Sequence, residues 1–412
     1  MTSSDWIALL TSFAAIITAV GGIWYQQHRI SLERMEHKEK SPEKTLHGWS
    51  TGLLKPPPPV SDDEIIDVSL PYQAGAPIRN PKLFYGRKEQ LASAMRCITG
   101  TNMASIFILG ARKSGKTSSF YYLNHLLNPD NYPQVIPVIL HSQIPISSDK
   151  NFYAYMYREA SAILASRCKG NLQAPEIPRE VEFDTLSTFL RQASSKGWRF
   201  VFMVDEFESL VNNKLLSGEG FFASLRSLVP QVEISWVLSS YRTVYMPGTL
   251  TSPFVNVVQD YLYLGPLLDW DARLLISEPA ARAGHPFDSE DVELILDLAG
   301  RMPFLIQKAC LSMYTSRRAG RGRQETRNQL NATFRLDIGP YLETQLSRLL
   351  PEEREALFDL VLQKDVTKHK ITLNSLERYG LVEMKQDQYC LPGRSWEDYL
   401  YRKAKESMAA AD

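Results

Sequence analysis

The chain has 412 residues, of which 44% are hydrophobic and 22% are charged. These values are ordinary for a globular protein, and the length allows two or three domains. Lysine plus arginine equals aspartate plus glutamate at 46 each, so no overall charge attracts the protein to nucleic acid or anionic lipid. The four cysteines lie far apart and form no C-x-x-C pair, which argues against a structural zinc site or a disulfide framework and favours a reducing, cytosolic setting.

Near the N-terminus, residues 6–25 contain no charged side chain and have aromatic residues at both ends. This length matches one bilayer crossing, and aromatic residues favour the membrane interface. Asp5 precedes the run and basic residues follow it, which disfavours a cleaved signal peptide and places the rest of the chain in the cytoplasm. We therefore expect a single-pass membrane protein anchored by residues 1–28. The alternative is a helix buried against the protein body or a partner, because glycine and hydroxyl side chains dilute the run.

The next segment, residues 29–76, is polar at first and then rich in proline, with consecutive prolines at positions 56–59. Proline-rich chains prefer extended backbone without hydrogen-bonded partners. We therefore expect a spacer between the N-terminal segment and the rest of the protein.

A short motif at residues 110–117 has the sequence GARKSGKT and fits the pattern G-x-x-x-x-G-K-[ST]. It follows an apolar run at 105–109, expected to be a buried strand, and precedes a segment at 118–127 that can form a helix. In this pattern backbone N–H groups surround phosphates, the lysine reaches the β- and γ-phosphates, and the hydroxyl holds Mg²⁺. The dipole of the following helix faces the same anion. The predicted phosphate-binding residues are Gly110, Ala111, Arg112, Lys113, Ser114, Gly115, Lys116, Thr117 and Ser118.

A second apolar run, at residues 200–204, follows Arg199 and leads directly into Asp205 and Glu206. A buried strand of this kind delivers carboxylates at its C-terminal edge, where ligands of parallel sheets bind. We expect Asp205 to hold Mg²⁺ through water and Glu206 to polarise the attacking water, because hydrolysis of this type depends on positioning and charge neutralisation.

Further strands are expected at 134–141, 233–239 and 261–264, with helices at 151–168 and 183–196 between them. This order predicts an α/β fold, a doubly wound parallel sheet of the P-loop NTPase type. Arg242 follows the 233–239 strand and would stabilise charge on the γ-phosphate, unless it forms a surface salt bridge.

The C-terminal third is predicted to be mostly helical. Residues 288–318 are expected to form two amphipathic helices that would cover the nucleotide as a lid. Four arginines lie within residues 317–323, and we expect this segment to be either a flexible basic loop or a contact for phosphates or for a partner. Helices at 351–362 and 372–383 and a hairpin around 385–387 suggest a winged helix. Its second helix carries few base-reading side chains, so packing or partner contact is favoured over DNA binding.

In this order, the motifs resemble the AAA+-related signal-transduction ATPases called STAND, in the branch close to archaeal and origin-recognition ATPases, over about residues 77–400. The resemblance implies that residues 77–87 pack near the adenine, through Phe84, Tyr85, Gly86 and Arg87. For the two aromatic residues, ordinary core packing is the alternative.

The family's lid usually contains a G-x-P element that contacts the nucleotide, but here Arg301 stands where the glycine is expected. Either Pro303 keeps the adenine contact or Arg301 acts as the lid arginine of other AAA+ proteins. Both interpretations remain open at this stage.

The expected segments are a transmembrane anchor at 1–28, a linker at 29–76, a P-loop ATPase core at 77–270, a helical lid at 271–345 and a winged helix at 346–412. The resemblance implies ATP and Mg²⁺ as ligands, slow regulatory hydrolysis, a homo-oligomer when ATP is bound and an unknown protein trigger. Such a switch would control signalling or a membrane effector, for instance in defence. The alternatives are a nucleic-acid-handling ATPase that uses the winged helix and a secretion or assembly ATPase.

Overall fold

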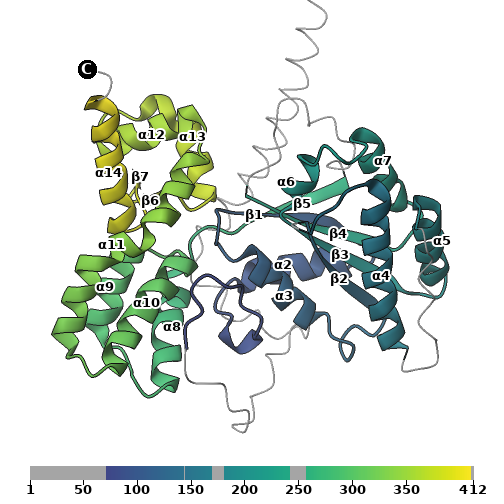
Figure 1. The fold of residues 1–412 in the computed structure, drawn as a ribbon, viewed down its shortest axis with the longest axis horizontal. Coiled ribbons are helices and arrows are strands. Elements are labelled where there is room, and N and C mark those ends of the chain that lie inside the picture. Colours follow the sequence, from purple (N-terminus) through teal and green to yellow (C-terminus); the bar gives the residue numbers. More distant parts are fainter. Residues whose placement is uncertain (1–70, 143, 169–180, 242–256, 410–412) are drawn as a thin grey trace, which may run out of the picture. The chain divides into compact units, whose positions relative to one another are not determined.

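The computed structural model describes residues 71–142, 144–168, 181–241 and 257–409 (Figure 1). Within these residues, no helix is both long and apolar enough to cross a membrane. This finding corrects the predicted single-pass membrane localisation. The run at 6–25 that suggested an anchor lies outside the described residues, as does the spacer up to residue 70.

A five-stranded sheet forms the centre of the N-terminal part, in the order β2-β3-β4-β1-β5. Every neighbouring pair of these strands is parallel, which confirms the predicted parallel α/β sheet. The order places the carboxyl ends of β1, β3 and β4 side by side along one edge. The strands are β1 Ser105–Leu109, β2 Val135–His141, β3 Arg199–Asp205, β4 Ile234–Ser240 and β5 Val258–Tyr263.

Helices cover both faces of the sheet, as Figure 1 shows. Alternate residues of a strand point to opposite faces, so Ile106 and Ile108 of β1 pack with α2 and α3, whereas Phe107 and Leu109 belong to the core shared with α4, α5 and α7. Burial on both faces explains why these strands are continuous apolar runs. The helices are α2 Lys88–Thr99, α3 Lys116–Leu126, α4 Asp149–Arg167, α5 Phe183–Ser194, α6 Phe207–Val211 and α7 Glu219–Leu228, with a short 3₁₀ turn, η2, at Pro81–Leu83.

The lid consists of α8 Asp269–Arg282, α9 Ser289–Ala299, α10 Pro303–Arg318 and α11 Arg323–Ser347. The two predicted amphipathic helices correspond to α9 and α10. Asp288 caps α9 together with Asp291, and Pro303 begins α10, where its missing N–H needs no partner. The helix α11 is 25 residues long and continues past the expected end of the lid at residue 345.

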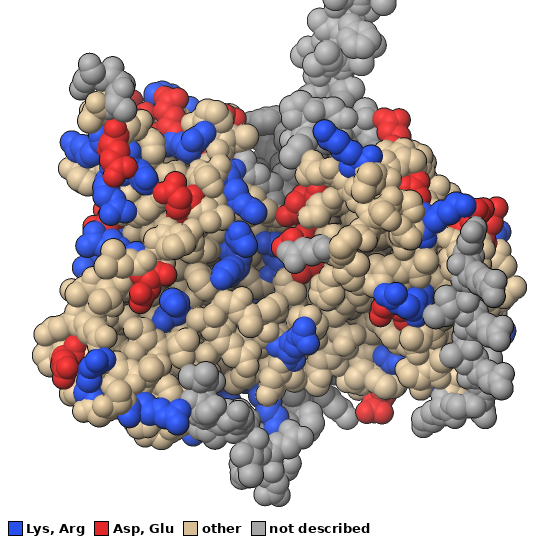
Figure 2. Space-filling model, viewed as in Figure 1, with Lys and Arg blue, Asp and Glu red and all other residues tan. Residues whose placement is uncertain are grey.

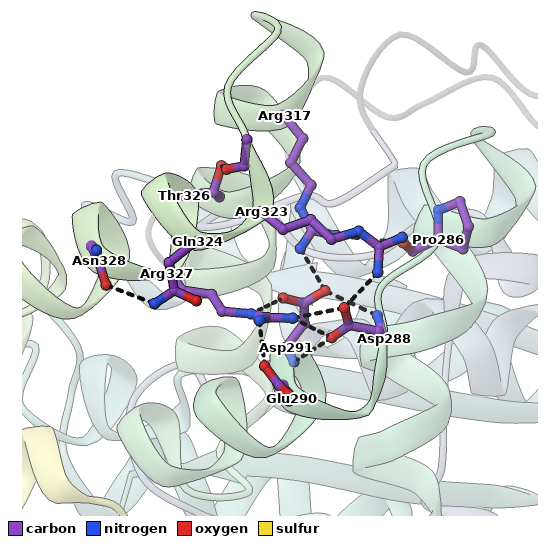
Figure 3. Close-up of polar contacts among 11 residues, drawn as sticks. Pro286, Asp288, Glu290, Asp291, Arg317, Arg323, Gln324, Thr326, Arg327 and Asn328 are labelled. Atoms are coloured by element: carbon purple, nitrogen blue, oxygen red, sulfur yellow. Dashed lines mark hydrogen bonds and ion pairs between the residues drawn. The ribbon is translucent and has the colours of Figure 1, made fainter.

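The expected flexible basic loop at 317–323 is wrong, because α10 extends to Arg318 and α11 begins at Arg323. Arg317 lies 2.6 Å from the buried Asp291, and Arg327 binds both Asp288 and Asp291 (Figure 3). Arg323 also pairs with Asp288, at 2.6 Å. These ion pairs join α9, α10 and α11.

The C-terminal segment contains α12 Pro351–Val361, the 3₁₀ turn η4 Thr367–His369, α13 Lys370–Arg378, strands β6 Glu383–Lys385 and β7 Gln388–Cys390, and α14 Arg394–Ala409. The two strands pair antiparallel. The helices and hairpin follow the predicted order, while the assignment to the winged-helix class stays a prediction. The end of α13 packs on the core, where Tyr379 contacts Tyr263 with ring centroids 6.1 Å apart.

Candidate nucleotide-binding site

A cavity of about 450 Å³ lies where the carboxyl edge of the sheet, the segment ahead of α2 and the lid meet. The predicted loop contributes residues 112–118 to its wall, and the sheet edge contributes Asp205 and Glu206. The lid contributes Leu275, Pro303 and other residues of α10. The motifs separated in sequence therefore share one cavity.

The phosphate loop has a conformation that requires its glycines. A Cβ atom on Gly110 would lie 2.6 Å from Ser114 Oγ and 2.7 Å from the Leu264 carbonyl oxygen, closer than real Cβ atoms approach. Gly115 has a φ of 103°, in the left-handed region that glycine adopts without steric cost. Gly110 and Ala111 themselves stay outside the cavity wall.

Lys116 lies at the start of α3, and its ammonium donates to the carbonyl oxygens of Gly110 and Ala111 at 2.8 and 2.9 Å. Burial lowers the pKa of Lys116 to about 8, although Glu208 and other nearby carboxylates favour the charged form. The ammonium is thus held in place by neutral carbonyls. A phosphate would supply the negative charge that the buried ammonium needs.

Thr117 and Asp205 form the predicted metal-binding pair. The Thr117 hydroxyl donates to Asp205 Oδ2 at 2.6 Å, and the other carboxylate oxygen accepts from Ser239 Oγ at 2.5 Å. Hydroxyl and carboxylate oxygens are the hard ligands that Mg²⁺ prefers, so these residues fit that ion. Ser239, near the end of β4, therefore orients the carboxylate.

Glu206 lines the cavity directly after β3 and has left-handed backbone, with φ 51°. Such backbone is uncommon for a residue with a side chain and persists where the surroundings hold it. Ser142, after β2, holds it here by donating to the Glu206 carbonyl oxygen at 2.7 Å. The turn therefore directs a second carboxylate to the same cavity.

The predicted adenine-contacting segment forms another part of the cavity wall. Phe84, Tyr85 and Arg87 line the cavity, but Gly86 does not. A Cβ on Gly86 would lie 2.9 Å from Asp271 Oδ2, so this glycine permits a close approach of α8. The Arg87 guanidinium is buried and donates to carbonyl oxygens, including Pro266 at 3.2 Å and Ser114 at 3.4 Å. It therefore ties the phosphate loop to the segment between core and lid.

Ser118 and Ile78 both line the cavity, and the Ser118 hydroxyl accepts a hydrogen bond from the Ile78 N–H at 3.0 Å. Pro303 lines the cavity, whereas Arg301 donates to the Leu267 carbonyl oxygen at 3.1 Å and pairs with Glu383 at 3.2 Å. Pro303 thus lies at the cavity and Arg301 does not, while the nucleotide contact of either residue stays a prediction. Arg242 lies outside the described residues.

Several cavity residues have no motif that could have identified them. Gln307 of α10 accepts from the Gln73 N–H at 2.7 Å, and His141 and Tyr121 complete the wall near the sheet edge. Their residue types are common in helices and loops, and only the tertiary arrangement brings them to the cavity.

Residues 77–370 match the family model described as Novel STAND NTPase 1. Among solved structures, the Walker-type ATPase PABY2304 of Pyrococcus abyssi is 12% identical, with 79% of this chain and 98% of that chain covered and a TM-score of 0.57. The ORC2 protein of Aeropyrum pernix is 13% identical, with 82% and 97% covered and a TM-score of 0.46. The RuvB Holliday junction branch migration motor of Thermotoga maritima is 14% identical, with 79% and 95% covered and a TM-score of 0.42. No curated protein sequence matches the chain. Because the family model covers more than half of the chain, the chain belongs to the Novel STAND NTPase 1 family of P-loop ATPases.

Proposed function

We propose that this protein binds ATP with Mg²⁺, hydrolyses it slowly and uses the bound nucleotide to control its self-association. The observation that carries the proposal is the 2.6 Å hydrogen bond between Thr117 and Asp205, beside Lys116, in a cavity that the lid also lines. It brings a hydroxyl and a carboxylate from two separate motifs to the position where a metal–triphosphate site needs them.

The proposed roles follow from the side chains at the cavity. Lys116 binds the β- and γ-phosphates, since its ammonium is buried and already aligned by carbonyl oxygens. Thr117 and Asp205 hold Mg²⁺, which when bound neutralises phosphate charge. Glu206 accepts a hydrogen bond from the attacking water and orients it toward the γ-phosphate. Phe84, Tyr85 and Pro303 lie against the adenine.

The C-terminal segment, residues 346–412, is proposed to be a winged helix used for packing. This proposal is supported by Arg378 of α13, whose guanidinium lies 5.6 Å from the ring centroid of Tyr263. Lys364 and Lys368, which precede α13, both pair with Asp359. On the face shown in Figure 2, basic and acidic side chains are interspersed. These contacts favour the switch over a nucleic-acid-handling ATPase.

The test compares wild type with Lys116→Ala and Glu206→Gln. Lys116→Ala should weaken nucleotide binding at least about tenfold, because a charge-assisted contact to phosphate is lost. Glu206→Gln should retain ATP but lower the hydrolysis rate by roughly a hundredfold, the usual effect of losing a positioned base. Calorimetric titration and phosphate release measure the two effects. Lys150→Ala, on the exposed side of α4, is the matched control and should change neither.

Self-association is tested on the same variants by measuring mass in solution with ATP, ADP and no nucleotide. Wild type should form a larger species only with ATP, Glu206→Gln should stay in that species, and Lys116→Ala should remain in the small one. If Glu206→Gln neither traps ATP nor shifts the mass, the switch mechanism is wrong.

A further inference from the structure

Lys113 stands in the middle of the phosphate loop with left-handed backbone, at φ 62°. This region of backbone conformation is sterically unfavourable for any residue with a Cβ atom, and single residues that persist in it concentrate at functional sites. The loop motif accepts any residue type at this position, glycine included. Because glycine would avoid this unfavourable backbone, the lysine at position 113 indicates a functional role for its side chain.

The ammonium of Lys113 reaches across the cavity to the lid. It lies 4.1 Å from the ring centroid of Phe304, in the first turn of α10, and Phe304 lines the same cavity. A cation over an aromatic face is attracted by the electron density of the ring. A phosphate-loop side chain thus contacts the lid directly.

The lid also holds the residue before Lys113 in the loop. Phe304 packs on Tyr341 of α11, with ring centroids 4.8 Å apart, and the Tyr341 hydroxyl donates to the Arg112 carbonyl oxygen at 3.3 Å. The Gln345 amide donates to the same oxygen at 3.2 Å. Among these contacts, only the one between Lys113 and Phe304 involves a charged group. A phosphate would therefore compete with Phe304 for the Lys113 ammonium.

The surroundings of Lys113 are electropositive. Burial, followed by the charges of Arg112 and Lys308, lowers the pKa of the Lys113 ammonium. No acidic side chain in the described part of the chain forms an ion pair with it. A hydrogen bond from an ammonium to a phosphate oxygen is stronger than a contact with an aromatic ring, so a phosphate within reach would draw the ammonium from Phe304.

We propose that Lys113 distinguishes triphosphates from diphosphates by moving its ammonium from Phe304 to the γ-phosphate. The charge of a diphosphate is met by Lys116 and the N-terminus of α3, so Lys113 stays on Phe304. The third phosphate adds charge that requires a further cation, and Lys113 lines the cavity with no acidic partner among the described residues. Its departure releases the contact between the loop and α10. The inference rests on the proposed ATP site. It adds that binding of the γ-phosphate loosens the lid by removing the contact between Lys113 and Phe304.

The test measures the dissociation constants of a non-hydrolysable ATP analogue and of ADP, both with Mg²⁺, by calorimetric titration. Lys113→Gly and Lys113→Met should weaken triphosphate binding about tenfold, the loss expected for one charge-assisted hydrogen bond, and leave ADP binding within about twofold. Phe304→Leu should shift the preference the opposite way, toward the triphosphate, by about threefold, because the competing aromatic contact is gone.

Lys113→Gly relieves the left-handed backbone, so it should fold as well as wild type, and a thermal unfolding curve checks this. Lys308→Met is the matched control: it removes a nearby positive charge of α10 that lies outside the cavity wall, and should change the preference by less than about twofold. Hydrogen exchange of residues 303–318 reports the lid, and should be faster with the triphosphate than with ADP in wild type but not in Lys113→Met.

The outcomes separate the two proposals. If wild type binds both nucleotides but the Lys113 and Phe304 variants keep its preference, or shift it in the same direction, the inference about Lys113 is wrong and the ATP site stands. If wild type binds neither nucleotide, both proposals are overturned. Opposite shifts, together with loss of the difference in hydrogen exchange, would support the inference.

Discussion

At the residue scale, Lys116 and Asp205 are prepared for the proposed ligands in different ways. Lys116 lies at the start of α3, and burial lowers its pKa to about 8. Asp205 is held differently, by the hydroxyls of Thr117 and Ser239, one on each carboxylate oxygen. A phosphate would therefore give the Lys116 ammonium a counter-charge, whereas the Asp205 carboxylate is already oriented by two hydroxyl groups.

The pKa of Lys116 predicts a pH dependence of nucleotide binding. A bound phosphate raises that pKa, so binding favours the protonated ammonium, and affinity should be constant below about pH 8 and decrease above it. Each pH unit above the free-site pKa should weaken binding by up to about tenfold, until the pKa of the complex is reached. Calorimetric titration of ADP between about pH 7 and 9.5 measures this dependence. The Lys116→Met variant should bind ADP weakly, and its affinity should not change over this pH range. If its affinity fell with pH as steeply as in wild type, another group would be responsible for the pH dependence.

At the scale of elements, the lid is held together by a buried network of charges. Asp291 is fully buried and is contacted by Arg317 and Arg327, while Asp288 caps α9 and accepts from Arg327 and Arg323 (Figure 3). Burial opposes the charged form of Asp288, but the backbone N–H of Asp291 and the guanidinium groups lower its pKa to about 2. The contacts of the Asp288 carboxylate are therefore fully formed at neutral pH and are lost as the pH falls toward 2.

This network predicts unequal effects of two neighbouring arginines. Arg327→Met should lower the free energy of unfolding by about 3 kcal/mol, because it leaves the buried Asp291 with one cation fewer. Arg323→Met, which removes a side chain that is 61% exposed, should cost less than about 1 kcal/mol. Urea denaturation measures both. Equal losses would show that the buried pairing contributes no more than a surface ion pair.

At the scale of the whole molecule, the C-terminal segment is packed against the segment joining core and lid. A Cβ atom on Gly380 would lie 2.7 Å from Pro266 Cδ, so the two segments approach to a distance that only glycine allows. Gly380 has left-handed backbone, with φ 75°. The contact places the end of α13 beside the link between β5 and α8. The strand β5 pairs with β1, which leads into the phosphate loop.

A matched pair of glycines tests this packing. Gly380 and Gly320 both have left-handed backbone, but the space around Gly320 is open. Alanine should strain the backbone equally at both positions, so Gly380→Ala should cost about 1–3 kcal/mol more in the free energy of unfolding, from the contact with Pro266 alone. Hydrogen exchange over 351–409 should also increase only in Gly380→Ala. A similar loss in both variants would mean that the packing is loose enough to adapt.

The strands and the first lid helices could be predicted because their signals are local. Apolar runs such as 105–109 and 200–204 are buried on both faces of the sheet, and the phosphate-loop pattern combines glycine positions with a lysine and a hydroxyl. The arginines at 317–323 were misjudged for the opposite reason. The partners of Arg317 and Arg323 are Asp291 and Asp288 at the start of α9, and no local pattern indicates that pairing.

By itself, the sequence determined the parallel α/β class, the phosphate loop and the carboxylates after β3, because each depends on residues close together in the chain. Only the tertiary structure decided that Pro303 and not Arg301 lines the cavity, that Ser239 holds Asp205, and that Lys113 reaches Phe304. These outcomes depend on which distant segments meet. Such contacts form because they bury apolar surface and give buried polar groups hydrogen-bond partners. Both conditions depend on the whole folded chain and not on neighbouring residues.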